Sequence, residues 1–402
     1  MTLQTRNSHM NAQLDPVETA HALVSVLRQR SAETSELGRL PEETISEMDK
    51  GGLFDLLVPR TDGGLEVDLQ TYMDVLVEIA RGDGAVAWTL GILSGAPWLL
   101  AALFPPDVSQ EILRTRGARI ATVLSPRRIK ARQLHGGYLI EKGEWSFNSG
   151  FFHAHWNLLG FPVQNEDGAV IDNLAALLPA EKCLALGDWD TFGLRGSGST
   201  TIVVEQAFIP KDQTVSLASG LKGEYASTHL ENHPLYRLPL MPFLSMKLLF
   251  PSLGMAKAAL EFALSTSSRR AIPFTIYNRQ DDAPITHLQF AEAATKIDTA
   301  ETILQRNVKI LGDMASRRTA VNHLTKARIM RDAGFVNQIL WEAIDLLATA
   351  CGGSMAQLDN PLGAVWRNAK VASLHGGLNT TTNFELFGRV QSGKSPQSWV
   401  LG

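Results

Sequence analysis

The residues with the clearest potential for chemistry stand in the last quarter of the chain, where residues 366–388 read WRNAKVASLHGGLNTTTNFELFG. The histidine of this segment, His375, is followed directly by Gly376 and Gly377. Histidine titrates near neutral pH, so it can move protons in catalysis. Histidine near a helix C-terminus is also favoured electrostatically, and glycine after it is an ordinary helix stop. The helix-stop rules favour the capping interpretation, and the catalytic one stays open.

Aromatic rings and hydroxyl groups are concentrated a second time in residues 143–156, which read GEWSFNSGFFHAHW. This segment holds Trp145, Ser149, His153 and His155. A metal ion would need a third and a fourth ligand, and no cluster of cysteines or carboxylates is evident, so no metal is expected. An aromatic wall with hydroxyl donors fits a flat aromatic cofactor, and a packed β core would have a similar composition.

The most glycine-rich stretch is GLRGSGSTT at residues 193–201. A dinucleotide-binding loop would join a strand to a helix, whereas the next residues here, TIVVEQAFIP, have the composition of a strand. The pattern therefore favours a tight turn inside a β domain. Its backbone N–H groups and hydroxyls could still hold an anion or a ring carbonyl. Neither a hydrolase elbow after a strand nor a Walker phosphate loop is found.

Three zones of the chain, which differ in composition and in the spacing of their apolar residues, must position these residues. From about residue 16 to 116, apolar residues stand three and four apart, which predicts helices. Between 118 and 210, short β-rich segments alternate with Gly, Pro and Asp, which predicts a compact antiparallel β domain. From 240 onward, long amphipathic segments predict a helical bundle. The sequence thus predicts an α+β protein that is mostly α, divided into residues 1–116, 117–232 and 233–402.

The 402-residue chain is 45% hydrophobic and 19% charged, with a net charge of −4, a balance typical of a globular protein with a large core. Its basic residues are dispersed, so nucleic acid is not an expected partner. Two cysteines far apart in sequence indicate reduced thiols in a cytoplasmic protein. Every apolar run is interrupted before about 18 residues, so no membrane span is expected. The run NSHM at residues 7–10 predicts an expression-vector remnant.

Taken in order, the motifs resemble those of the acyl-CoA dehydrogenase family. The matching runs are VPRTDGGLEVDLQTYMDVLVEIARGDGAVAW, GYLIEKGEWSFNSG, FGLRGSGSTTIVVEQAFIP and NPLGAVWRNAK, and they cover nearly the whole chain. The resemblance implies an N-terminal helical domain, a central antiparallel β domain and a C-terminal four-helix bundle. It also implies a homo-oligomer, a tetramer. The apolar content of the C-terminal helices exceeds what one small bundle needs, which agrees with a subunit interface.

Two departures separate this sequence from the dehydrogenases of the family. Where one version of those enzymes carries its catalytic carboxylate, in an E-G-T-S-like run, this sequence has His375. The dehydrogenase run W-I-T-N reads WSFNSG here. Both features are similar to the flavin-dependent monooxygenase branch of the fold. That branch comprises the oxygenase components of two-component aromatic hydroxylases, with dibenzothiophene and amino-sugar N-oxygenases as relatives.

This branch implies a reaction. A separate flavin reductase delivers reduced FMN or FAD, which reacts with O₂ to give a C4a-hydroperoxide. One oxygen atom then passes to an aromatic or heteroaromatic small molecule, such as a phenol or an indole. The pocket must exclude water, since the intermediate is otherwise wasted. The aromatic sequence around Trp88, Trp98 and Trp145 suits a dry pocket.

The resemblance also assigns roles to residues. His375 is implied as the base or hydrogen-bond partner of the substrate or peroxide, with Ser125 and Ser149 as further catalytic residues. The implied flavin contacts are Thr122, Trp145, Ser149, Arg270, Phe274, Gly352 and Gly353. Within this set Ser149 stands near the flavin N5, and Arg270 and Phe274 reach the cofactor across a subunit interface.

Other functions stay open. Several phenol hydroxylases of this branch carry a second histidine in a V-H-N-W-like run, where this sequence reads GAPW with Ala96. Indoles, other heteroaromatics and N- or S-oxygenation therefore remain beside phenols. An acyl-CoA dehydrogenase would need a carboxylate base, for which Glu385 is the nearby candidate. A scaffold that binds no flavin is the third alternative.

Overall fold

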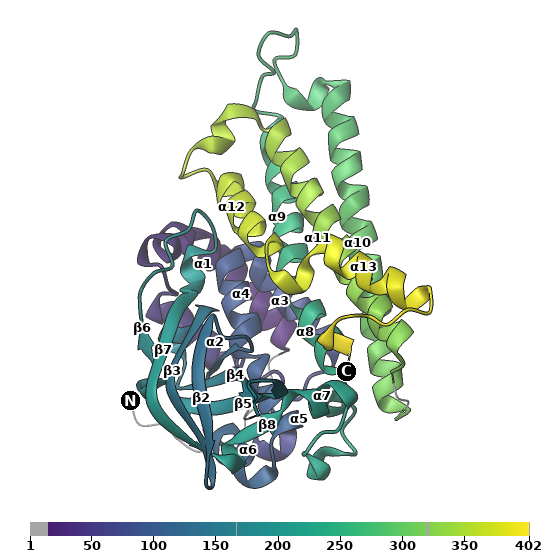
Figure 1. The fold of residues 1–402 in the computed structure, drawn as a ribbon. Coiled ribbons are helices and arrows are strands. Elements are labelled where there is room, and N and C mark those ends of the chain that lie inside the picture. Colours follow the sequence, from purple (N-terminus) through teal and green to yellow (C-terminus); the bar gives the residue numbers. More distant parts are fainter. Residues whose placement is uncertain (1–14, 166, 319–320, 402) are drawn as a thin grey trace.

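The computed structural model describes residues 15–165, 167–318 and 321–401, so the predicted vector remnant lies outside the described residues. Two helical parts lie one above the other, with a β domain against the lower one (Figure 1). The N-terminal helices are α1 (Pro16–Leu37), α2 (Glu42–Lys50), α3 (Leu69–Gly82), α4 (Gly84–Leu93), α5 (Ala96–Leu103) and α6 (Pro106–Leu113). The predicted first boundary, at 116, falls between α6 and the first strand.

Side-chain caps explain where several of these helices begin. Asp15 accepts a hydrogen bond from the Val17 N–H at the start of α1. Asp83 lies buried between α3 and α4 and accepts from two N–H groups in the first turn of α4, those of Ala85 and Val86. Each carboxylate satisfies donors that have no partner within the helix and complements its dipole.

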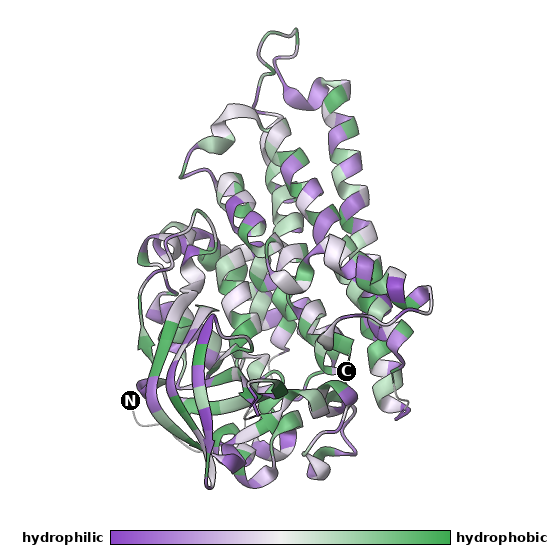
Figure 2. Ribbon diagram, viewed as in Figure 1, coloured by the Kyte–Doolittle hydropathy of each residue, from purple (hydrophilic) through white to green (hydrophobic). Residues whose placement is uncertain are grey.

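The most apolar helices lie at the centre of the molecule. Two stretches, Gly84–Leu103 and Leu240–Ser267, are long and apolar enough to cross a membrane by length and composition, but 94% and 67% of their most apolar windows are buried inside the protein. The first is broken between α4 and α5. Figure 2 shows these central helices as mostly apolar, whereas the outer helices of the bundle alternate polar and apolar residues. Both stretches are therefore core helices, as predicted for residues 85–104.

The β domain consists of two four-stranded sheets, with orders β1-β4-β5-β8 and β2-β3-β7-β6. The strands are β1 (Ile120–Val123), β2 (Arg128–Leu134), β3 (Gly137–Asn148), β4 (Trp156–Gln164), β5 (Val170–Pro179), β6 (Leu184–Ala185), β7 (Thr200–Pro210) and β8 (Thr214–Ser216). A separate apolar core, with Trp145 and Ile202 from one sheet and Phe161 from the other, fills the space between the sheets.

The predicted antiparallel β domain is confirmed, and it contains one parallel pair of strands. Strands β1 and β4 pair in parallel, with Ile120 opposite Trp156, whereas the other pairs are antiparallel. Parallel neighbours require a long connection. Here the chain leaves β1, forms β2 and β3 in the other sheet, and then returns as β4.

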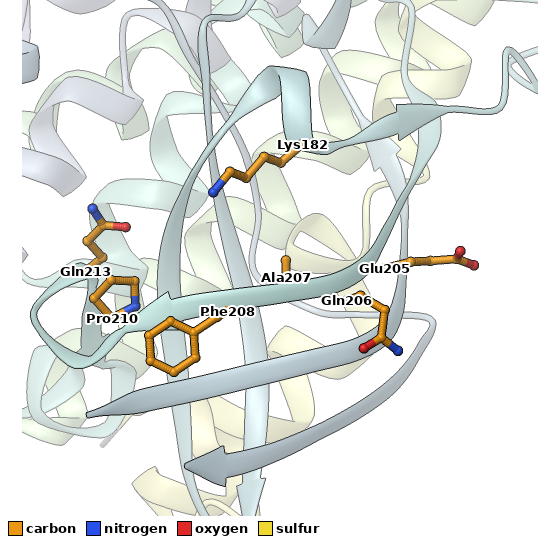
Figure 3. Close-up of a pocket in the computed structure, with 7 residues that line it drawn as sticks. All are labelled: Lys182, Glu205, Gln206, Ala207, Phe208, Pro210 and Gln213. Atoms are coloured by element: carbon orange, nitrogen blue, oxygen red, sulfur yellow. The ribbon is translucent and has the colours of Figure 1, made fainter. Parts of the chain in front are cut away.

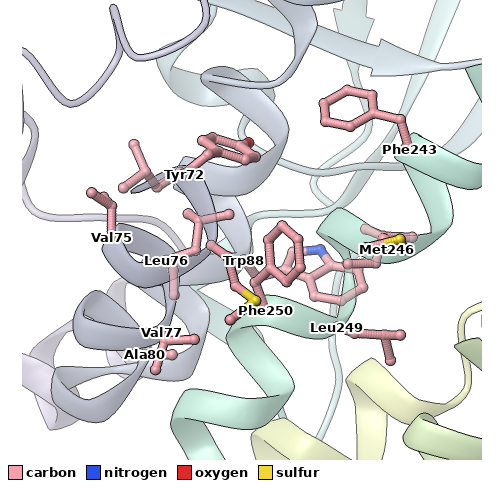
Figure 4. Packing of buried hydrophobic residues seen from close by; sticks show 14 of the residues in the cluster. Tyr72, Val75, Leu76, Val77, Ala80, Trp88, Phe243, Met246, Leu249 and Phe250 are labelled. Atoms are coloured by element: carbon pink, nitrogen blue, oxygen red, sulfur yellow. The ribbon is translucent and has the colours of Figure 1, made fainter. Parts of the chain in front are cut away.

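The C-terminal part is the predicted helical bundle. Its helices are α8 (Leu240–Lys247), α9 (Leu249–Ser267), α10 (Pro284–Ser316), α11 (His323–Ala350), α12 (Pro361–Ser373) and α13 (Thr380–Gln391), and the short α7 (Leu217–Lys222) precedes them. Helix α9 packs against α3, so closely that a Cβ on Gly254 would lie 2.2 Å from the Val77 carbonyl oxygen. Figure 4 shows the shared core, in which Trp88 of α4 lies with Met246 and Phe250 of the bundle. This contact joins the two helical parts.

Candidate active site

A chain of buried hydroxyls connects the glycine-rich loop to strand β3. The Ser149 Oγ lies 2.7 Å from the Ser199 Oγ, which lies 2.6 Å from the Ser197 Oγ. The Ser197 hydroxyl donates to the Leu194 carbonyl at 2.7 Å, and the Trp88 indole N–H donates to the Ser149 Oγ at 3.1 Å. The three serines are at most 6% exposed, so their hydroxyls depend on one another.

The groups at the two ends of this row of hydroxyls fix the direction of its hydrogen bonds. A carbonyl oxygen only accepts, so the Ser197 hydroxyl must donate to the Leu194 carbonyl. The Ser199 hydroxyl then donates to Ser197, and the Ser149 hydroxyl donates to Ser199. The indole N–H of Trp88 fills one lone pair of the Ser149 oxygen. Ser149 is therefore left with one free lone pair and no free proton. Toward any neighbouring group it acts as an acceptor.

Trp88 also brings His375 to this cluster. The indole and imidazole centroids are 5.8 Å apart, with the rings tilted by 59°. His375 follows α12 and begins the 3-10 turn η10 (Gly376–Leu378), where its Nδ1 accepts from the Gly377 N–H at 3.1 Å. The ring thus caps the turn that follows it, not the helix that precedes it. With Nδ1 an acceptor, the neutral ring carries its proton on Nε2 and presents an N–H donor.

His375 is exposed to solvent, although protein atoms surround much of its ring. The residue is exposed, yet burial of the ring, followed by the positive charge of Lys247, lowers the pKa of His375 to about 4. At neutral pH the ring is uncharged.

A buried lysine near this ring was not anticipated from the sequence. Lys247, the last residue of α8, is 5% exposed, and its ammonium donates to the Gly91 carbonyl at 2.8 Å. Burial lowers the pKa of Lys247 to about 7. Gly91 stands one turn after Trp88 on α4, so both residues share a helix face. No sequence signal marks Lys247, because it is one of many dispersed basic residues.

Two of the recognised motifs dock onto each other and hold the site together. A Cβ on Gly193 would lie 2.0 Å from the Arg367 carbonyl oxygen, so only glycine permits this approach. Next to it, the Leu194 N–H donates to the Asn368 side chain at 2.7 Å. The loop that carries Ser197 and the helix that leads to His375 are thereby fixed to each other. The GLRGSGSTT stretch is the predicted tight turn before a strand.

Thr122 lies on β1 and Ser125 follows this strand, which packs against the helix that carries Trp88 and the strand that ends just before Ser149. Strand β1 packs against both α4 and β3. The Thr122 Oγ1 on this strand is buried without a hydrogen-bond partner in the described chain. Ser125 is exposed in the segment that follows β1. Because a buried hydroxyl without a partner is uncommon, Thr122 is suited to a ligand with polar atoms.

Trp145 lies elsewhere. Its side chain is fully buried in the core between the two sheets, and its indole N–H donates to the Gly160 carbonyl at 2.7 Å. The structure therefore does not bring Trp145 together with the Ser149 cluster. The exposed aromatic ring of this motif is Phe147, which is 70% exposed and packs edge-on against Trp189 at 6.0 Å.

The backbone explains why Phe147 points outward. Its φ is +67°, a left-handed conformation that bulky residues rarely adopt, and the pairing of β3 with β7 shifts register between Trp145 and Asn148. Such outliers are found at binding sites. Strand β3 thus turns one ring of WSFNSG into the core and the other outward. The sequence motif contained Phe147 but gave no sign that it was the exposed ring.

The remaining predicted flavin contacts form a second group at the far end of the bundle. The Arg270 guanidinium donates to the Ser354 hydroxyl, beside Gly352 and Gly353, both of which face open space. Phe274 is fully exposed on the loop between α9 and α10, the uppermost loop in Figure 1. Helix α12 leads from this end toward His375, and its 13 residues span about 20 Å. The predicted site residues of one chain therefore form two separate groups.

The first of these groups, around Trp88, combines hydrogen-bond donors and acceptors. It offers an acceptor at Ser149, a donor at His375 Nε2 and an unsatisfied hydroxyl at Thr122. Among the described residues, no group of three His, Cys, Asp or Glu side chains could hold a metal ion.

A shallow hollow elsewhere has no relation to this chemistry. It has a volume of about 590 Å³ and lies on the outer face of the β domain (Figure 3). Its lining consists of Lys182, Glu205, Gln206, Ala207, Phe208, Pro210 and Gln213. No predicted site residue is among them.

Three histidines are expected to make stability depend on pH. Burial lowers the pKa of His153, His155 and His375 from 6.5 to about 4. Between these values the unfolded chain binds protons that the folded chain does not, so the free energy of unfolding decreases as the pH falls through this window. Tm is expected to fall from pH 6.5 toward pH 4, and less in His153→Gln. An equally steep fall in that variant would exclude a contribution from His153.

Comparison with known proteins agrees with this architecture. The model of the acyl-CoA dehydrogenase N-terminal domain matches residues 15–113, and that of the acyl-CoA dehydrogenase C-terminal domain matches residues 248–380. The two matches span more than half of the chain. The chain belongs to the acyl-CoA dehydrogenase family, as the order of its motifs predicted.

Its relatives fall in the monooxygenase branch. The flavin-dependent monooxygenase oxygenase subunit HsaA of Rhodococcus jostii is 27% identical over 373 residues, 92% of this chain and 97% of the relative. The oxygenase component of the FADH₂-dependent resorcinol hydroxylase of Rhizobium sp. is 26% identical, over 93% of each chain. XiaF from Streptomyces sp., solved with FADH₂ and glycerol, is 27% identical with a TM-score of 0.88 over 96% of both chains. The predicted resemblance to this branch is confirmed.

Proposed function

We propose that this chain is the oxygenase component of a two-component flavin-dependent monooxygenase that hydroxylates an aromatic or heteroaromatic small molecule. The observation that carries the proposal is the arrangement of His375, Trp88 and Ser149, which puts an N–H donor and a hydroxyl acceptor beside one indole. The full-length similarity to oxygenase components supports it. Reduced FMN or FAD, when bound, would activate O₂ and supply the oxygen atom.

The residues of the chain would divide the work as follows. Ser149 would accept a hydrogen bond from the N5–H of a bound reduced flavin, Thr122 would bond to a polar atom of the flavin, and Ser125 would face the substrate. His375 would donate a hydrogen bond from its Nε2–H to the oxygen atom that is transferred. Phe147, and not Trp145, offers the exposed ring of β3. Trp88 excludes water between Ser149 and His375, since it is only 6% exposed.

The dehydrogenase alternative is less well supported. It requires a carboxylate in the place of His375, and Glu385 is exposed on α13, where it pairs with Arg389 of the same helix at 3.9 Å. An exposed carboxylate in an ion pair on a helix surface is a weak general base.

The exposed apolar side chains support a homo-oligomer, which we propose is a tetramer. Large apolar residues are exposed on the bundle and its loops, among them Phe274, Ile276, Leu288, Leu358 and Leu374. Phe274 and Ile276 stand together on the loop between α9 and α10, and an exposed apolar patch of this kind supports an interface. A partner subunit would bring Arg270, Phe274, Gly352 and Gly353 to the group around Ser149 and His375 of its neighbour. The other proposed partner is a flavin reductase, and the proposed location is the cytoplasm.

An anaerobic titration with flavin tests the proposal, because the free lone pair of the Ser149 oxygen favours a ligand that has a hydrogen-bond donor. Reduced flavin carries a proton on N5 and oxidised flavin does not. We expect the chain to bind reduced FMN or FAD more tightly than the oxidised form, and then to form hydroxylated product when oxygen and an aromatic substrate are added. In Ser199→Ala the Ser149 proton is freed to donate, so the preference for reduced flavin should fall about tenfold, the worth of one hydrogen bond.

The matched control is Ser109→Ala. Ser109 is equally buried, but its hydroxyl bonds to the Pro105 carbonyl on α6, outside the site. This variant should keep the wild-type ratio of dissociation constants. If the wild-type chain binds no reduced flavin, the proposed function is wrong. An unchanged ratio in Ser199→Ala would refute only the role of the hydroxyl chain.

A further inference from the structure

Lys247 is a buried cation that the proposed chemistry does not yet use. Among the described residues it takes part in no ion pair, and its one hydrogen bond goes to the Gly91 carbonyl. The Gly91 carbonyl would keep a hydrogen-bond donor without Lys247, because the Tyr72 hydroxyl also donates to it, at 3.1 Å. Buried ammonium groups are normally paired with an anion, since isolation from water is costly.

The place of Lys247 in the fold connects it to the site. A Cβ on Gly95 would lie 2.7 Å from the ammonium nitrogen, so the ammonium lies at the break between α4 and α5, next to Ala96. Helix α8, which carries Lys247, also packs on the turn of His375, because a Cβ on Gly377 would come within 3.9 Å of Ser245 Oγ. The absence of a side chain at Gly95 leaves room for the ammonium. This arrangement provides a cation at the position where the sequence has no second histidine.

We propose that Lys247 binds an acidic oxygen of the substrate, a phenolic hydroxyl or its anion, and so restricts the substrates to hydroxylated aromatic compounds. The inference rests on the proposed function and names its substrate class. A phenol is favoured over a carboxylate because an ionised phenol donates electrons into the ring that must accept an oxygen atom, whereas a carboxylate withdraws them. The lowered pKa of Lys247 agrees, since a proton can then be shared between the amine and a weakly acidic oxygen.

Binding of para-nitrophenol to the flavin-free protein tests this inference without any turnover. The phenol is compared with para-nitroanisole, its methyl ether, and with para-nitrobenzoate. The wild-type chain is expected to bind the phenol at least about tenfold more tightly than the ether, the worth of a hydrogen bond to a charged group. The absorption band of the anion should increase on binding. Lys247→Met should lose both the preference and the band.

The outcomes separate this inference from the proposed function and from a purely structural role. Lys247→Met is expected to fold, because methionine has a similar shape and Gly91 keeps the Tyr72 hydroxyl. Equal binding of phenol and ether by the wild type, or tighter binding of the benzoate, would overturn the inference even if hydroxylation of another substrate is observed. A variant with a lower Tm that keeps the preference for the phenol would also overturn it, since Lys247 would then only support α4.

Discussion

Replacement of His375 by alanine is expected to lower the rate of product formation about 10²–10³-fold while the affinity for reduced flavin changes little. The reason is that the Nε2–H of the neutral ring is a fixed donor in a desolvated site, and loss of such a donor to a developing negative charge has this effect. Product formation and oxygen consumption, measured together at saturating reduced flavin, give the coupled rate.

The control is His375→Asn, which distinguishes the catalytic role from the capping role. An asparagine oxygen can accept from the Gly377 N–H, as Nδ1 does at 3.1 Å, but it places no donor where Nε2 stands. We expect this variant to keep the stability of the wild type and to be as slow as alanine. Coupled hydroxylation at the wild-type rate in either variant would exclude the catalytic role.

The pKa of about 4 adds an expectation for the pH profile. A histidine that acts as a base is commonly recognised by a rate that falls as it is protonated near its ordinary pKa of 6.5. Here the ring stays neutral down to about pH 4, so no step near pH 6.5 is expected from His375. The ring is a donor that is already in the required protonation state. This refines the prediction from the sequence, which left base and hydrogen-bond partner open.

The elements of the fold were predictable because their signals are local. Apolar spacing placed helices in α1, α9, α10 and α11, and the β-rich segments became β1, β3, β4, β5 and β7. Strand β2, with the sequence RIKARQL, has no apolar run, since it is mostly exposed on the edge of its sheet. A local pattern could not reveal it.

The geometry of the site could not be predicted because it depends on residues far apart in the chain. Trp88 and Ser149 are 61 positions apart, and Ser149 and Ser199 are 50 apart. The resemblance to a family predicted Ser149 and His375 as site residues, but it could not say which of their atoms donate. Those directions follow from the Leu194 carbonyl and the Gly377 N–H. Lys247 is likewise recognisable only from what surrounds it.

Substitution of Gly193 by alanine is expected to destabilise the fold by about 1–3 kcal/mol, the range for overpacking, and to lower coupled product formation more than tenfold. The added Cβ would lie 2.0 Å from the Arg367 carbonyl oxygen and 2.4 Å from its carbon, and neither backbone atom can rotate away. Gly193 is not among the residues with positive φ, so the cost comes from this contact and not from backbone strain. Tm and the coupled rate measure the two effects.

The two effects have one cause, because the contact joins the loop of Ser197 and Ser199 to the helix that leads to His375. When the loop moves away from α12, the 2.7 Å hydrogen bond from the Leu194 N–H to Asn368 is lost as well. Gly312→Ala is the control: Gly312 is in α10, a Cβ there meets nothing within 4 Å, and alanine is the better helix former. If Gly193→Ala matches that control in both Tm and coupled rate, the docking of the two motifs does not hold the site together.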